Sequence, residues 1–176
     1  MSKKTLATIF VAGVLVLPLL SFAQSASGTL AVTATLQSSI SMVFNSNAGG
    51  VTLGGAGTNA ATLNFGNISA YGTLAANVSR SVGAASFTVS TPFNVQVDKS
   101  NSSSANYTLT AQLASADAVN TWALNGTGIT NASATTVANT GAYGGTGTAY
   151  TLALTVPMSN TAASISNTID FVATAN

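Results

Sequence analysis

TLAVTATLQSSISMVF, residues 29–44, is the stretch that decides the fold. Its even-numbered positions are apolar apart from Ser38: Leu30, Val32, Ala34, Leu36, Ile40, Met42 and Phe44. Polar residues fill most of the odd-numbered positions. A period of two is the pattern of a half-buried β-strand, because successive side chains of a strand point to opposite faces. The stretch therefore predicts one long strand, or two strands joined at residues 37–39.

The same alternation recurs along the rest of the chain. It is clearest at Phe93–Val97, Tyr107–Leu113, Tyr150–Val156 and Ile165–Ala173, with shorter candidates at Val51–Leu53, Thr62–Phe65, Leu74–Val82, Ser86–Ser90 and Thr121–Leu124. Clusters of Gly, Asn and Ser separate these runs, as is typical of turns. No stretch has a helical period longer than about one turn. The sequence therefore predicts an all-β chain that forms a single antiparallel β-sandwich of the immunoglobulin-like or pilin-like type.

The N-terminus has the pattern of a Sec signal peptide. A basic Lys3-Lys4 pair precedes an apolar run at 6–20, and Ser21-Phe22-Ala23 offers the small residues that a signal peptidase requires. An uncleaved membrane anchor is the alternative, since the apolar run is almost long enough to span a bilayer. Cleavage after residue 23 predicts a mature domain at 24–176. That domain would be extracellular or at the cell surface, after periplasmic transit if the cell is Gram-negative, and would not be membrane-bound.

The predicted mature domain has very few charges. Its ionisable side chains, termini and tyrosines aside, are Arg80, Lys99, Asp98, Asp117 and Asp170. Two cations cannot neutralise a run of phosphates, so a nucleic-acid partner is not expected. Attachment to an anionic membrane through a polybasic patch is excluded for the same reason.

The residue inventory also argues against catalysis. The chain has no His and no Cys, so the common base–nucleophile pairs cannot form, and zinc lacks its usual ligands. A calcium site near Asp98 and Asn101 would have one carboxylate only. We therefore expect no enzyme activity, no cofactor and no bound metal. The absence of Cys also means that the core must hold without a disulfide.

Residues 24–37 are a candidate donor or edge strand. They carry neither a charged residue nor a proline. Soluble proteins usually place such residues on a strand to protect a sheet edge. In one interpretation, this ribbon is a covered strand of its own domain. In the other, it adds to the sheet of a neighbouring copy, with Leu30, Val32, Ala34 and Leu36 filling pockets. Head-to-tail repetition of that contact gives an open homopolymer.

Several stretches resemble a known group of proteins. The alternating N-terminal segment, Leu63-Asn64-Phe65-Gly66 and Ile169-Asp170-Phe171-Val172-Ala173 are similar to secreted bacterial pilin-like β-sandwich proteins. That group includes the spore coat U domain family and donor-strand fibre subunits, and loosely the TasA-like matrix proteins. The resemblance implies a structural subunit of a fimbrial or matrix fibre. The chain departs from the group in having no disulfide, and Ala175 replaces the penultimate aromatic residue of usher-assembled pilins.

A monomeric surface adhesin or carbohydrate-binding module is the alternative function. Tyr71 and Tyr143 both lie beside glycine in predicted loops, where we expect exposed aromatic rings. Such rings could contact a sugar or a host or matrix surface.

Overall fold

The computed structural model describes residues 26–162 and 164–176. The predicted signal peptide, residues 1–23, lies outside the described residues. The chain divides into two units, residues up to Thr35 and Leu36–Asn176. Of the first unit, the described residues 26–35 form no strand, and their side chains are exposed. Across both described ranges, no helix is long and apolar enough to cross a membrane.

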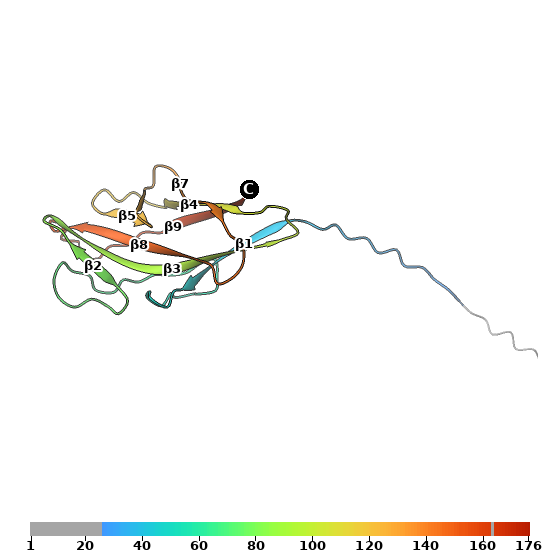
Figure 1. The fold of residues 1–176 in the computed structure, drawn as a ribbon, viewed down its shortest axis with the longest axis horizontal. Coiled ribbons are helices and arrows are strands. Elements are labelled where there is room, and N and C mark those ends of the chain that lie inside the picture. The colour runs from blue at the N-terminus through green and yellow to red at the C-terminus, as the bar shows by residue number, and fades with distance from the viewer. Residues whose placement is uncertain (1–25, 163) are drawn as a thin grey trace, which may run out of the picture. The chain divides into compact units, whose positions relative to one another are not determined.

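The described part of the second unit is all-β, as the sequence predicts. Its strands are β1 (Ser39–Ser46), β2 (Ser79–Val82), β3 (Ser86–Ser100), β4 (Tyr107–Leu113), β5 (Thr121–Leu124), β6 (Thr127–Ile129), β7 (Thr135–Gly141), β8 (Thr148–Pro157) and β9 (Ile169–Ala175). They form two antiparallel sheets, one ordered β1-β3-β8-β5-β6 with β2 also paired to β3, and the other ordered β7-β4-β9. The two sheets lie in separate layers (Figure 1), which is consistent with a β-sandwich.

Strand β3 is the longest element and organises the first sheet. Its side chains alternate between buried and half-buried from Ser86 to Val97. The sequence predicts two strands here, at 86–90 and 93–97, but the structure joins them through Pro92. A proline is tolerated in this strand because β2 pairs with residues 87–90 and β1 with 93–100, so Pro92 faces the gap between them.

The core lies between the two sheets. The buried side chains come mainly from β3, β4 and β8, with Trp122, Leu124 and Ile129 closing one side. Thr91 is the one polar side chain among the fully buried ones of the described residues. Its hydroxyl accepts a hydrogen bond from Val51 N at 3.0 Å and donates to Asn77 O at 2.9 Å. The Thr91 hydroxyl therefore links both ends of the segment between β1 and β2, at Val51 and Asn77, to the centre of β3.

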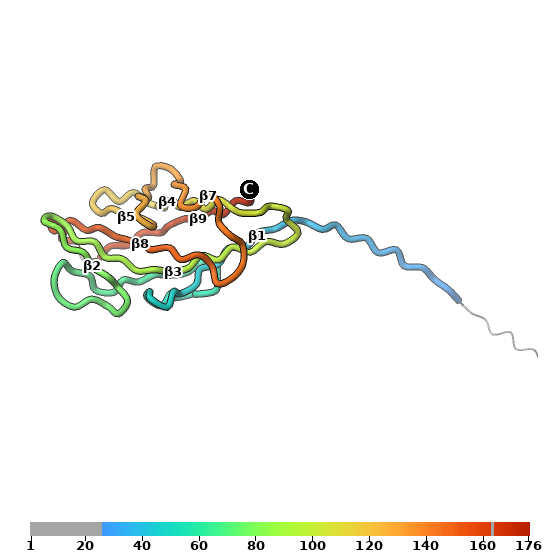
Figure 2. The backbone as a smooth tube through the Cα atoms, in the orientation of Figure 1, coloured from blue at the N-terminus to red at the C-terminus, as the bar shows by residue number. Residues whose placement is uncertain are grey.

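The loop from residue 47 to residue 78 passes beside β2 and β3 (Figure 2). Its segment 61–65 is extended, with Leu63 and Phe65 turned inward. Its pairing to another segment is a single bridge between Gly54 and Thr62. The strand predicted at Thr62–Phe65 is therefore an extended segment that shares no sheet with the named strands.

Candidate functional site: an apolar groove between the sheets

A groove of about 1240 Å³ opens into the interior of the second unit. Its floor is the inner face of the first sheet, with Phe87 and Phe93 from β3, Trp122 from β5, and Leu152 and Leu154 from β8. All five side chains also belong to the buried core. Protein interiors are normally close-packed, so a groove of this size leaves these side chains, which are only 2–8% exposed, without packing partners on one side.

Two extended segments form the lips of the groove. One lip is residues 59–71 and the other is residues 164–171. On the second lip, burial alternates: Ile165, Ile169 and Phe171 are half-buried, whereas Ser166 and Asp170 between them are exposed. The sequence predicts this alternation correctly. Both lips thus present apolar side chains inward, at the two-residue spacing of a β-strand.

The backbone of the second lip is a free sheet edge. Strand β9 pairs with β4 on one side, and the described residues supply no strand on its other side. Thr168 O accepts from Ala114 N beside β4. Because backbone groups alternate in direction along a strand, the N–H and C=O groups of Ile169 and Phe171 point away from β4. They are available to a further strand.

The inner end of the groove is bounded by an aromatic cluster. The ring of Phe44 lies 5.2 Å from that of Phe171, and Phe93 lies 6.1 Å from Phe171 and 6.4 Å from Phe44, centroid to centroid. The opposite end, which we call the mouth, is flanked by Tyr71 and Met158. Between the two ends, the lip from Ser164 to Phe171 spans seven residue steps, or about 23 Å.

A hydrogen-bonded network holds the floor of the groove at Trp122. Asp117 Oδ2 accepts from Trp122 Nε1 at 2.8 Å, and Asp117 Oδ1 accepts from Asn120 N at 2.8 Å and Val119 N at 3.1 Å. Burial acts to raise the pKa of Asp117, but these hydrogen bonds outweigh it and lower the pKa to about 2. Asn160, which follows β8 and lines the groove, donates to Asn120 Oδ1 at 2.9 Å. The network therefore joins the floor to the segment that follows β8.

The predicted self-assembly residues are exposed. The side chains of Leu30, Val32 and Leu36 are 88, 80 and 78% exposed, and Ala34 is exposed too. The strand predicted across residues 29–44 begins only at Ser39, so residues 29–36 form no strand in the described part of the chain.

The two tyrosines proposed as surface contacts differ in their surroundings. Tyr71 is 73% exposed. Tyr143 is half-buried: its ring lies 5.4 Å from that of Tyr107, Lys99 Nζ lies 5.0 Å above its centroid, and its hydroxyl donates to Asn106 O at 3.1 Å. The side chain of Tyr143 therefore packs against Tyr107 of β4 and bonds to the loop 101–106, which corrects the expectation that it is exposed.

Sequence reasoning missed the groove itself. The sequence predicts alternation at 165–173 and a short strand at Thr62–Phe65, but the separation of the two lips depends on which strands pair, and that information is not local. Among the described residues, no three His, Cys, Asp or Glu side chains come together as a metal site would require. Asp98, the one carboxylate near which a calcium site was considered, accepts a hydrogen bond from Gln96 Nε2 at 2.8 Å.

Comparisons with known proteins identify no relative: no protein-family model, no curated protein and no solved structure matches the chain.

Proposed function

We propose that this protein is a non-catalytic structural subunit of an extracellular or cell-surface fibre or matrix, and that it assembles with itself by β-strand addition. Residues 29–36 of one copy are the added strand, and the groove of the next copy receives it. The observation that carries this proposal is the groove, a cleft of strand length with an apolar floor and a free sheet edge along one lip.

The dimensions of strand and groove agree. Leu30 to Leu36 spans six residue steps, or about 20 Å when extended, against about 23 Å for the lip. Leu30, Val32, Ala34 and Leu36 share one face of such a strand, at the spacing of the side chains on the lips. Burying each leucine or valine contributes about 1.5–3 kcal/mol, before the cost of ordering the strand.

Charge also favours this pairing. Residues 24–37 carry no charged side chain, and the groove lining has one, the exposed Asp170. No desolvated charge therefore opposes insertion. Export of the chain, as its N-terminal pattern predicts, would place the assembled material outside the cell.

Covalent reach favours insertion into a second copy over insertion into the same copy. Three residue steps join Leu36 to Ser39 and span at most about 11 Å. Ser39 pairs with Ser100 at one end of β3, whereas the mouth lies by Pro157, which pairs with Ser86 at the other end. These ends of β3 are about 46 Å apart. A strand that leaves through the mouth therefore belongs to another copy.

Microscopy of matched variants tests the assembly. We expect filaments in negative stain from the purified chain, and none from the double variant Val32→Asp, Leu36→Asp, which would bury two carboxylates. The control Thr33→Asp, Thr35→Asp adds the same charge to the opposite face of the strand and should still assemble. A wild-type chain that stays monomeric at high concentration would refute self-assembly.

Peptide binding tests the groove directly. The full-length Val32→Asp, Leu36→Asp chain should bind the peptide TLAVTATLQ, residues 29–37, because its own strand can no longer compete. The control peptide TLATVALTQ has the same composition with the alternation broken, and should bind at least tenfold more weakly. Equal binding of both peptides, or displacement of the first by a fatty acid that blocks filaments, would indicate a site for small apolar ligands instead.

A further inference from the structure

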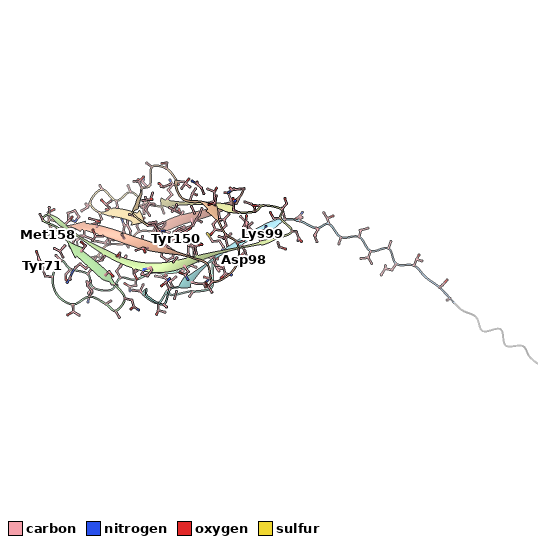
Figure 3. All side chains as sticks on the ribbon, viewed as in Figure 1. Tyr71, Asp98, Lys99, Tyr150 and Met158 are labelled. Atoms are coloured by element: carbon pink, nitrogen blue, oxygen red, sulfur yellow. The ribbon has the colours of Figure 1, made fainter. Side chains whose placement is uncertain are left out.

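Two exposed apolar side chains lie at the mouth of the groove, and the proposed strand addition assigns them no contact. Tyr71 is 73% exposed and Met158 is 39% exposed, and both line the groove. Both lie at the same end of the second unit, away from Asp98 and Lys99 (Figure 3). Exposed aromatic and methionine side chains beside a binding groove are typical of protein interfaces.

Tyr71 is held in its exposed position. Arg80 Nη1 donates to Ser69 O at 2.9 Å and to Gly72 O at 3.1 Å, on either side of Tyr71. Gly72 has a φ of 100°, which a residue with a side chain rarely adopts, and the Ser69 hydroxyl donates to Tyr71 O. One of the few cations of the chain thus fixes this loop. A side chain on a fixed backbone loses less entropy when it binds a partner.

The proposed assembly fixes what lies opposite the mouth. When Leu36 of the incoming strand reaches the mouth, Ser39 of the same copy lies within about 11 Å of it. Ser39 pairs with Ser100, and the loop 101–106 begins there. In this loop, Asn101 Nδ2 donates to Gln37 O at 3.2 Å. This bond attaches the linker, residues 37–38 between the added strand and β1, to the loop. The loop therefore arrives at the mouth together with the strand.

We propose that Tyr71 and Met158 form a second contact between copies, with the loop 101–106 of the copy whose strand occupies the groove. This inference rests on the proposed strand addition. The loop offers Ser and Asn side chains and Ala105, and no charge of its own. Hydroxyl and amide groups suit the Tyr71 phenol, and Ala105 suits apolar contact with Met158. The contact sets the angle between successive copies, which a strand on a short linker alone leaves variable.

The experiment separates this contact from strand insertion. In filaments, Tyr71→Ala with Met158→Ala should speed dissociation of subunits at least tenfold. The loop-side substitutions Ser103→Asp and Ala105→Asp should also speed dissociation of filaments. In the full-length Val32→Asp, Leu36→Asp background, they should leave the affinity for the free peptide TLAVTATLQ within about twofold, since both residues are exposed and lie outside the groove lining. Val172→Ala, which removes an exposed side chain outside the groove lining, is the matched control and should change neither quantity.

Disulfide trapping gives a second readout. The chain has no Cys, so Tyr71→Cys combined with Ser102→Cys or Ser103→Cys should yield covalent ladders on oxidation of filaments. Tyr71→Cys with Thr174→Cys, on β9, should yield none. Filaments that dissociate at the wild-type rate without Tyr71 and Met158, together with no trapped ladder, would overturn the contact. Loss of peptide binding to the unmodified groove would instead overturn strand addition.

Discussion

The Cα atom of Gly141 lies against the ring of Tyr107. A Cβ atom on Gly141 would stand 2.6 Å from Cε1 of that ring and closer still to Cζ and Cε2. Tyr107 is fully buried, and the two residues pair across β4 and β7. Glycine is therefore required here to make room for the ring, since its φ lies outside the left-handed region.

Gly141→Ala should destabilise the fold by about 1–3 kcal/mol, because the added methyl group overpacks a fully buried ring. Gly128→Ala is the matched control: Gly128 lies in β6, also has an ordinary φ, and a Cβ atom there would meet nothing within 4 Å. Urea denaturation of both variants measures the difference. Equal midpoints for the two would contradict the close approach.

Asp117 should make the free energy of unfolding depend on pH in the acid range. Its folded-state pKa of about 2 lies below the unfolded value of about 3.9, so its contribution is present above pH 4 and is lost as the pH falls towards 2. Asp117→Asn should lower stability at neutral pH by about 1 kcal/mol and flatten the loss between pH 4 and pH 2. Thermal melts across this range provide the measurement.

Asp170→Asn is the control for that series, because the Asp170 side chain is exposed and lies outside the Asp117 network. Its melts should follow the wild type at every pH. An Asp117→Asn variant with the same acid profile as the wild type would show that the hydrogen bonds from Asn120 and Trp122 do not hold the carboxylate.

Thr91→Val should cost about 1–3 kcal/mol, because it leaves Val51 N buried without a partner and removes the bond to Asn77 O, while preserving shape. Thr88→Val is the control on the same strand: its hydroxyl lies 2.7 Å from that of Thr155 and is only half-buried. We expect Thr88→Val to stay within about 0.5 kcal/mol of the wild type. Chemical denaturation of both variants measures the difference in free energy of unfolding between losing a buried hydrogen bond and losing a half-buried cross-strand pair.

Filament assembly should be nearly independent of ionic strength. The Debye length falls from about 30 Å at 0.01 M to about 3 Å at 1 M salt, but neither the added strand nor the groove floor carries a charge to be screened. Light scattering in sodium chloride should show critical concentrations within about twofold across this range. A steep salt dependence would indicate that Asp170, Arg80 or Lys99 drives the contact.

Much of the fold could be predicted from local pattern. The alternation of apolar and polar residues predicts β4, β8 and β9. Each of these strands packs one face against the core, so its apolar residues recur at every second position. The alternation does not predict β7. Most residues of β7 are polar, its apolar Val137 and Ala138 are adjacent and only half-buried, and its pairing with β4 is irregular. Alternation cannot identify a strand that has no regular buried face.

The groove could not be predicted from pattern, for a physical reason. Its lips are more than 90 residues apart in sequence, and their separation depends on long-range pairing, such as that of β9 with β4 and the bridge from Gly54 to Thr62. Pairing partners are chosen by the whole fold. The interpretation of 24–37 as an uncharged ribbon that lacks strand partners was available from sequence, but its proposed receptor became visible only in three dimensions.

Strand β3 has a mechanical consequence. It runs from Ser100, beside the linker that would lead to one neighbour, to Ser86, beside the mouth that would receive the other. Tension along such a polymer would be parallel to β3 and would load its hydrogen bonds to β1 and β8 in shear, so that many must break together. Fibres built this way should resist pulling far better than peeling.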